Sequence, residues 1–112
     1  MTRGEIWWAD LADPVGSAPG YRRPVAIVSS DLFNASPIRT IVVAVLTSNL
    51  RLADAPGNVL VRAEETGLTK DSVVNASQIL TVDRGCLTDR IGSLPLKKLA
   101  RVDNGLREVL DL

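Results

Sequence analysis

Residues 40–47, Thr-Ile-Val-Val-Ala-Val-Leu-Thr, form the most strand-like stretch of the chain. Four of the eight are valine or isoleucine, whose branched side chains favour an extended backbone. The apolar run is continuous and does not alternate with polar residues, so we expect both faces of this strand to be buried. One face then packs on the core, and the other packs on a second layer or on a partner subunit.

Shorter strands are predicted on both sides of this central one. Alternating polarity and flanking turn residues indicate strands over residues 4–11, 24–29, 58–62, 72–80 (within the segment 71–82) and 89–93. Asn75 and Ser77 interrupt the fourth of these, which marks a bulge or an edge. Brief helical turns are predicted over residues 30–35 and 63–67, the second of them closed by Gly67.

The one long helix candidate covers residues 95–110. Its apolar residues recur at helical spacing, at Leu96, Leu99, Val102, Leu106, Val109 and Leu110. Gly105 weakens the middle of this helix by about 1 kcal/mol relative to alanine. The pattern as a whole predicts one α+β domain over residues 1–112, mainly β, in which a small twisted sheet closes toward a barrel and carries a C-terminal helix.

Composition excludes several classes of function. The chain has 112 residues, with 13 basic and 13 acidic side chains, and zero net charge argues against a generally basic nucleic-acid coat while allowing a local groove. It has no histidine, which excludes serine–histidine and cysteine–histidine hydrolases. Cys86 is the single cysteine, so neither an intrachain disulfide nor a thiolate metal cluster can form.

Nothing in the sequence predicts a membrane protein. The N-terminal apolar run is too short for a signal peptide, and no apolar stretch is long enough to span a bilayer. We therefore expect a cytoplasmic protein without a membrane partner.

Two features point toward a binding surface. Trp7 and Trp8 are adjacent, so on a strand they face opposite sides, one toward the core and the other toward an interface or ligand. Arg23 precedes Pro24, which biases it toward an extended backbone at the mouth of a strand, where its guanidinium suits a phosphate. Taken alone, Arg23 can equally be a solvated or carboxylate-paired arginine, and a hydroxyl such as Thr47 can merely cap a turn.

Several short motifs, taken in order, extend over nearly the whole chain. They are Arg-Gly-Glu-Ile-Trp at residues 3–7, Gly-Ser at 16–17, Arg-Pro-Val at 23–25, Leu-Thr-Ser at 46–48, Gly-Leu-Thr-Lys-Asp-Ser-Val-Val at 67–74, Gln-Ile at 78–79 and Thr-Val-Asp at 81–83. With this set the sequence resembles the MazF/PemK family of toxin endoribonucleases, the messenger-RNA interferases of bacterial toxin–antitoxin pairs. No single motif would be specific, but the combination is.

The resemblance implies an SH3-like β-barrel with a C-terminal α-helix, assembled as a homodimer. It implies cleavage of single-stranded RNA without a metal or cofactor, in which the 2′-hydroxyl attacks the adjacent phosphate. The family's catalytic arginine and threonine fall on Arg23 and Thr47. A MazE-like antitoxin, whose acidic tail would block the groove, is the implied protein partner.

Five further residues are predicted to bind substrate: Ser17, Tyr21, Arg22, Ser48 and Gln78. Tyr21 can stack on an unpaired base, and Arg22 can bind a flanking phosphate or pair with Asp13. Many relatives carry Gly-Ser-Glu-Gln in the loop, whereas this chain has Gly-Ser-Ala-Pro at residues 16–19.

Two rival hypotheses remain open at this point. A gyrase poison of the same fold, similar to CcdB, would carry a tryptophan in its C-terminal tail, which this chain lacks. An inactive, RNA-binding member of the family is favoured by the altered loop.

Overall fold

The computed structural model describes residues 1–12, 16–17 and 21–112. Its six strands are β1 (Glu5–Leu11), β2 (Tyr21–Ile27), β3 (Thr40–Thr47), β4 (Val59–Val61), β5 (Ser72–Asp83) and β6 (Leu87–Ser93). Its helices are α1 (Asp31–Asn34), α2 (Ala63–Thr66), α3 (Leu96–Leu110) and the short 3-10 helices η1 (Leu50–Asp54) and η2 (Arg84–Cys86). The order of the strands and of α1, α2 and α3 is the one predicted from the sequence, whereas η1 and η2 were not predicted.

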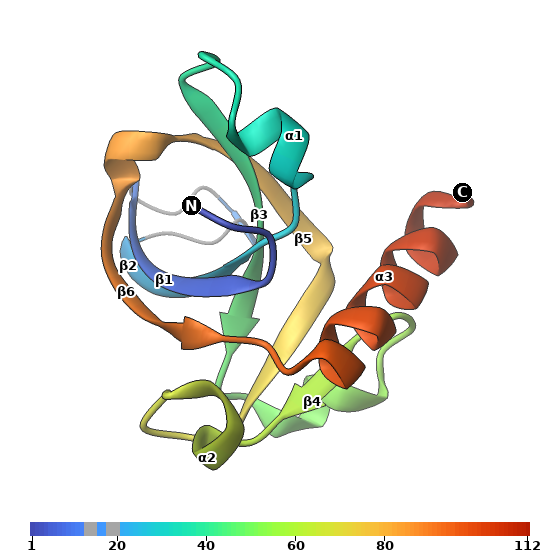
Figure 1. Cartoon of the computed structure of the whole chain (residues 1–112). Coiled ribbons are helices and arrows are strands. Elements are labelled where there is room, and N and C mark those ends of the chain that lie inside the picture. The colour runs from blue at the N-terminus through green and yellow to red at the C-terminus, as the bar shows by residue number, and fades with distance from the viewer. Residues whose placement is uncertain (13–15, 18–20) are drawn as a thin grey trace.

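All six strands belong to one antiparallel sheet. The strand order is β4-β5-β3-β2-β1-β6, so the apolar strand β3 is central, with β5 on one side and β2 on the other. Figure 1 shows the sheet curling into a ring, with α3 lying outside it and α1 and α2 at opposite ends. The prediction of a mainly β fold that closes toward a barrel and carries a C-terminal helix is confirmed.

Both faces of β3 are buried, as its continuous apolar run predicts. Ala44 and Leu46 belong to a cluster that includes Val102 of α3, so the second layer on this face is the helix of the same chain. Val43 and Val45 belong to a cluster made of strand residues alone, which the curl of the sheet encloses. The two layers of core thus share β3 as their common wall.

Strand β2 differs from its prediction at both ends. It begins at Tyr21, three residues before the expected start, and ends at Ile27. Pro24 therefore lies inside the strand, opposite Trp8 of β1, although proline cannot donate a ladder hydrogen bond. It is tolerated because the β2–β3 ladder begins only at Val25, so at Pro24 the strand has β1 as its neighbour on one side only.

The interruption predicted in β5 is a bulge. Ala44 pairs with Ile79 while the next residue, Val45, pairs with Asn75, which leaves three residues of β5 without a partner on β3. Side-chain oxygens stabilise this bulge: Asn58 Oδ1 accepts from the Ala76 N–H (2.9 Å) and Asn75 Oδ1 from the Ser77 hydroxyl (2.8 Å). Gln78 is one of the three bulged residues, so its backbone is released from the ladder.

The N-terminal segment is held by two ionic contacts. Arg3 pairs with Asp103 of α3 and donates through Nε to the Val28 carbonyl (2.9 Å). Glu5 accepts from the Thr2 N–H (2.8 Å) and lies 2.9 Å from Arg90 Nε of β6. No helix in the described part of the chain is long and apolar enough to cross a membrane.

Candidate active site

A cavity of about 280 Å³ opens where three neighbouring strands have their ends. The start of β2, the end of β3 and the connection that leads into β5 meet there, because antiparallel neighbours alternate in direction. The cavity is lined by Trp8, Arg23, Pro24, Leu46, Thr47, Ser48, Leu68, Thr69, Lys70 and Ser72. Its walls therefore combine an apolar floor with hydroxyl groups and two cationic residues.

The two residues predicted as the catalytic pair, Arg23 and Thr47, both line this cavity. The β2–β3 ladder ends at the pair formed by Val25 and Val45. Arg23 and Thr47 each lie two residues beyond that pair, on adjacent strands, which puts them at the same level of the sheet. Arg23 is exposed, and in the described residues it has no ion pair or hydrogen bond through its guanidinium.

Thr47 also has the structural role that its position suggests. Its Oγ1 accepts from the Asn49 N–H (3.2 Å), and Asn49 in turn caps η1 by accepting from the Arg51 N–H (3.3 Å). Accepting one hydrogen bond leaves the Thr47 hydroxyl proton free to donate. Ser48, predicted to bind substrate, lines the cavity as well and is exposed.

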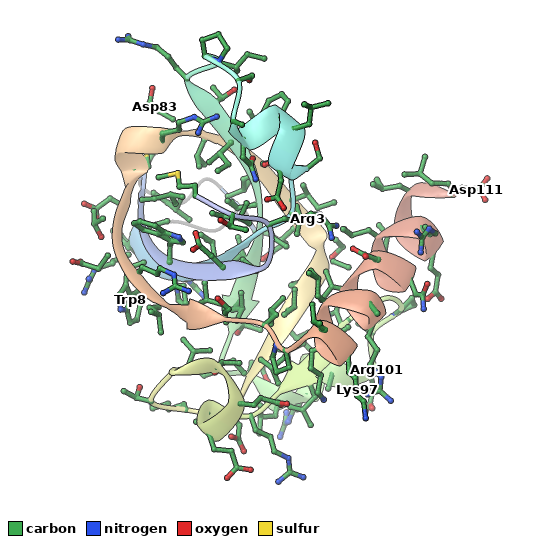
Figure 2. All side chains as sticks on the ribbon, in the orientation of Figure 1. Arg3, Trp8, Asp83, Lys97, Arg101 and Asp111 are labelled. Atoms are coloured by element: carbon green, nitrogen blue, oxygen red, sulfur yellow. The ribbon has the colours of Figure 1, made fainter. Side chains whose placement is uncertain are left out.

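The two tryptophans face opposite sides of β1, as predicted. Trp7 packs on the strand-only cluster, and its Nε1 donates to Glu5 Oε1 (3.2 Å). Trp8 lines the cavity, and Figure 2 shows it on the β1–β6 side of the sheet, away from the C-terminal end of α3. Each indole is half-buried.

Arg22 makes two contacts through its guanidinium, one with Trp8 and one with Asp89. Its guanidinium lies over the Trp8 ring, 4.5 Å from the ring centroid, and its Nη2 lies 3.0 Å from Asp89 Oδ2. The prediction offered Asp13 as its carboxylate partner, but Asp13 lies outside the described residues and Asp89 is the partner observed. The stack places the charge of Arg22 beside the cavity and fixes its orientation.

Three predicted substrate-binding residues lie elsewhere. Ser17 and Gln78 contact each other, since the Gln78 side-chain amide lies 3.4 Å from the Ser17 carbonyl. Tyr21 is 66% exposed and has a positive φ of 58°, a strained backbone for a tyrosine. None of the three lines the cavity. Ala18 and Pro19, where the loop departs from the relatives' pattern, are outside the described residues.

One wall of the cavity is formed by residues for which the sequence predicted no role. Leu68, Thr69, Lys70 and Ser72 belong to the motif at residues 67–74, which carried the resemblance without any assigned role. Lys70 brings a second cation to the cavity, and no carboxylate lines it within the described residues. The arrangement therefore suits a polyanion such as a nucleic-acid backbone.

The described ranges contain no group of three or more histidine, cysteine, aspartate or glutamate side chains that could hold a metal ion.

A family model described as PemK-like, MazF-like toxin of type II toxin–antitoxin system matches residues 2–110. The chain belongs to this family. The resemblance of its motifs to the MazF/PemK toxins is thus confirmed over almost the whole sequence.

Curated relatives in the MazF/PemK family match from end to end. The chain is 51% identical over 112 residues to endoribonuclease MazF6 of Mycobacterium tuberculosis, covering 100% of this chain and 98% of the relative. It is 38% identical over 113 residues to endoribonuclease EndoA of Bacillus subtilis, covering 100% of this chain and 96% of that protein.

Solved structures of MazF proteins share the fold. A mycobacterial endoribonuclease in complex with its cognate antitoxin superposes with a TM-score of 0.81 at 23% identity, covering 100% of this chain and 96% of that one. MazF from Deinococcus radiodurans gives a TM-score of 0.81 at 21% identity, and the superposition covers 100% of this chain and 97% of that chain. At these identities the two likenesses establish the MazF fold for this chain.

Proposed function

We propose that this protein is the toxin of a type II toxin–antitoxin system and acts as an endoribonuclease. Its family membership and the names of its full-length relatives support this function. The substrate proposed is single-stranded messenger RNA, cut at particular sequences so that translation and growth stop. The observation that carries the proposal is that Arg23 and Thr47 line one cavity with no carboxylate beside them in the described residues.

The proposed reaction uses a nucleophile that RNA itself provides. The ribose 2′-oxygen attacks the adjacent phosphorus, the new O–P bond forms, and the bond from phosphorus to the 5′-oxygen of the next nucleotide breaks. The products are a 2′,3′-cyclic phosphate and a 5′-hydroxyl end, and the proton of the 2′-hydroxyl is lost as the leaving oxygen gains one. Such a reaction requires neither a histidine nor a protein nucleophile.

Arg23 and Thr47 would stabilise the charge that develops on the phosphoryl oxygens. A guanidinium presents two parallel N–H donors that match two oxygens of a phosphate, and its charge stabilises the transition state most where water is excluded. The Thr47 hydroxyl would donate to a second oxygen and fix the orientation of the group. Because arginine stays protonated, Arg23 acts through its charge and not as a simple base.

We further propose a MazE-like antitoxin as partner and a homodimer as the assembly. A mycobacterial relative of the same fold was solved with its cognate antitoxin, which supports the first. For the second, an apolar groove of about 450 Å³ runs between the sheet and α3, lined by Val28, Val42, Ile79, Leu106, Leu110 and Leu112 with Arg3, Asp103 and Arg107. The compartment proposed is the cytoplasm, where messenger RNA is translated.

The test is cleavage of single-stranded RNA in the presence of a chelator, followed by sequencing of the ends. We expect defined cuts by the wild type, and loss of at least about a hundred-fold in rate for Arg23→Ala, the typical effect of removing one transition-state donor. Arg101→Ala is the matched control, because Arg101 is an exposed arginine of α3 outside the cavity. Cleavage that needs added metal, or equal loss in both variants, would refute the mechanism.

The same assay decides between the proposal and its rivals. RNA binding without turnover by the wild type would indicate an inactive family member. The gyrase-poison hypothesis has no support from the family model or the full-length relatives, which are MazF-like toxins and endoribonucleases.

A further inference from the structure

Lys70 is the second cationic residue of the cavity, and neither its motif nor the proposed reaction gives it a role. We infer that Lys70 binds a phosphate that flanks the scissile one, and so forms an RNA-backbone subsite on the connection between β4 and β5. The inference rests on the proposed function, because it assigns a further contact to the same substrate.

The position of Lys70 follows from the strand order. Thr47 lies at the end of the central strand β3, Arg23 lies on β2 at one side, and the segment that carries Lys70 enters β5 at the other side. Neighbouring strands are about 4.8 Å apart, so β2 and β5 are separated by roughly 10 Å with β3 between them. Lys70 thus approaches the cavity from the side opposite Arg23. This position suits a neighbouring phosphate of the RNA strand and not the phosphate that Arg23 would bind.

Lys70 does not form an ion pair with the neighbouring carboxylate. Asp71 is the adjacent carboxylate, but its Oδ1 accepts from the Ala63 N–H (2.9 Å) at the start of α2. No ion pair joins Lys70 to any acidic side chain in the described part of the chain. A lysine ammonium is a compact point charge with three donors, and it binds phosphate without the planar geometry that arginine demands.

The backbone that carries Lys70 is firmly anchored at both ends. At its end, the Ser72 hydroxyl donates to the Lys70 carbonyl (3.1 Å). At its start, the segment follows α2, which ends at Gly67 with a φ of 87°, a conformation that favours glycine. Helix α2 also packs closely on β6, because a Cβ at Gly92 would lie 2.0 Å from the Thr66 carbonyl oxygen. The subsite is therefore presented by a fixed segment, which lowers the ordering cost of binding.

The test compares Lys70→Gln with Lys97→Gln, since Lys97 is an exposed lysine on α3 outside the cavity (Figure 2). Binding is measured on an RNA oligonucleotide with a single 2′-deoxy substitution at the mapped break, across a range of salt concentrations. We expect Lys70→Gln to weaken binding roughly ten-fold, the usual size of one charge-assisted hydrogen bond. The slope of log affinity against log salt should fall by about 0.7, the value for one phosphate contact on a single strand.

Cleavage kinetics then locate the contact. Lys70→Gln should raise KM with little change in kcat, and Lys70→Arg should restore KM. The flanking phosphates are next neutralised one at a time as methylphosphonates. At one of the two flanking positions, the methylphosphonate should weaken RNA binding by the wild type about as much as Lys70→Gln does. At that same position it should not weaken binding by Lys70→Gln any further.

The possible results separate the two proposals. Unchanged affinity and salt slope in Lys70→Gln, equal effects in Lys70→Gln and Lys97→Gln, or a fall in kcat at constant KM would each overturn the subsite while leaving the nuclease intact. Wild-type protein that cuts no RNA would overturn the proposed function. The binding measurement, made then on unmodified RNA, would still decide whether Lys70 contacts phosphate.

Discussion

Replacing Gly105 with alanine should destabilise the protein, although alanine is the better helix former. An added Cβ would lie 2.0 Å from the Gly57 carbonyl oxygen, 2.9 Å from its carbonyl carbon and 3.1 Å from its Cα. To reach an ordinary contact distance, α3 must move away from the turn by roughly 1.4 Å. These contacts are with backbone atoms, so no side-chain rotation can relieve them.

The turn cannot easily yield to the helix. Gly57 has a φ of 80°, and the next residue, Asn58, uses its side chain to bond both the Leu52 carbonyl (2.9 Å) and the Ala76 N–H (2.9 Å). The helix must therefore lift from the sheet, which opens the cluster around Val102. Overpacking typically costs about 1–3 kcal/mol, and a clash with backbone at 2.0 Å belongs to the upper part of that range, about 2–3 kcal/mol, against a gain of about 1 kcal/mol in helix propensity.

We expect a net loss of about 1–2 kcal/mol, which corresponds to a fall in Tm of roughly 5–10 °C for a domain of this size. The assay is thermal unfolding followed by circular dichroism at one fixed protein concentration, because any dimer couples Tm to concentration. Asn104→Ala is the control, since Asn104 is exposed and alanine should leave Tm equal or higher. If Gly105→Ala melts as high as the wild type, the Gly57–Gly105 contact does not constrain α3.

Three further changes test other parts of the structure. Burial tends to raise the pKa of Glu5, but hydrogen bonds from Thr2 and Trp7 and the charges of Arg90 and the N-terminal amine outweigh it and lower that pKa. Glu5 therefore adds stability that is fully present above the usual glutamate pKa and is lost as the pH falls through the lower pKa of the folded state. The gap in urea unfolding between wild type and Glu5→Gln should stay constant from pH 7 down to about pH 5 and narrow below that; a gap that stays constant down to about pH 2 would contradict this. Arg22→Ala should change the fluorescence of Trp8 and weaken RNA binding, whereas unchanged emission would argue against the stack. Gly92→Ala should displace α2 and lower both Tm and kcat/KM; normal activity would show that the cavity wall does not depend on this contact.

The central strand was predictable because one local property decides it. A continuous run of branched apolar residues can be buried on both faces, and β3 is. The interruption of β5 was predictable for a similar reason, since Asn75 and Ser77 break its apolar pattern and the Asn75 side chain accepts from the backbone N–H of Ser77 in the bulge. In both cases the residues that carry the signal also make the contacts.

The register of β2 could not be predicted, because it depends on a neighbour distant in sequence. Pro24 looks like the start of a strand until its partner Trp8 is known. Gly105 looks like a weak point of the helix until Gly57 is seen against it. A glycine or proline in the sequence indicates that the backbone is constrained at that position. The segment that causes the constraint lies far away in the sequence, so only the tertiary structure shows it.

Part of the candidate site was predicted through the resemblance and not through spacing, and the roles of its residues stay predictions. Arg23, Thr47 and Ser48 line one cavity, while Ser17 and Gln78 contact each other outside it. Lys70 was missed because a lysine in a polar turn is usually only solvated. The role inferred for Lys70 depends on its position beside the cavity and on Asp71 accepting a hydrogen bond from the Ala63 N–H of α2, and no sequence pattern reveals either contact.

The most direct test of the mechanism changes one oxygen atom of the substrate. The wild-type protein is given an RNA oligonucleotide that contains its mapped cut site, and a second oligonucleotide that differs only in a 2′-deoxy sugar on the 5′ side of the break. If the 2′-hydroxyl is the nucleophile beside Arg23 and Thr47, the first is cut to a cyclic phosphate and the second stays intact while still binding. Equal cleavage of both oligonucleotides would contradict the account.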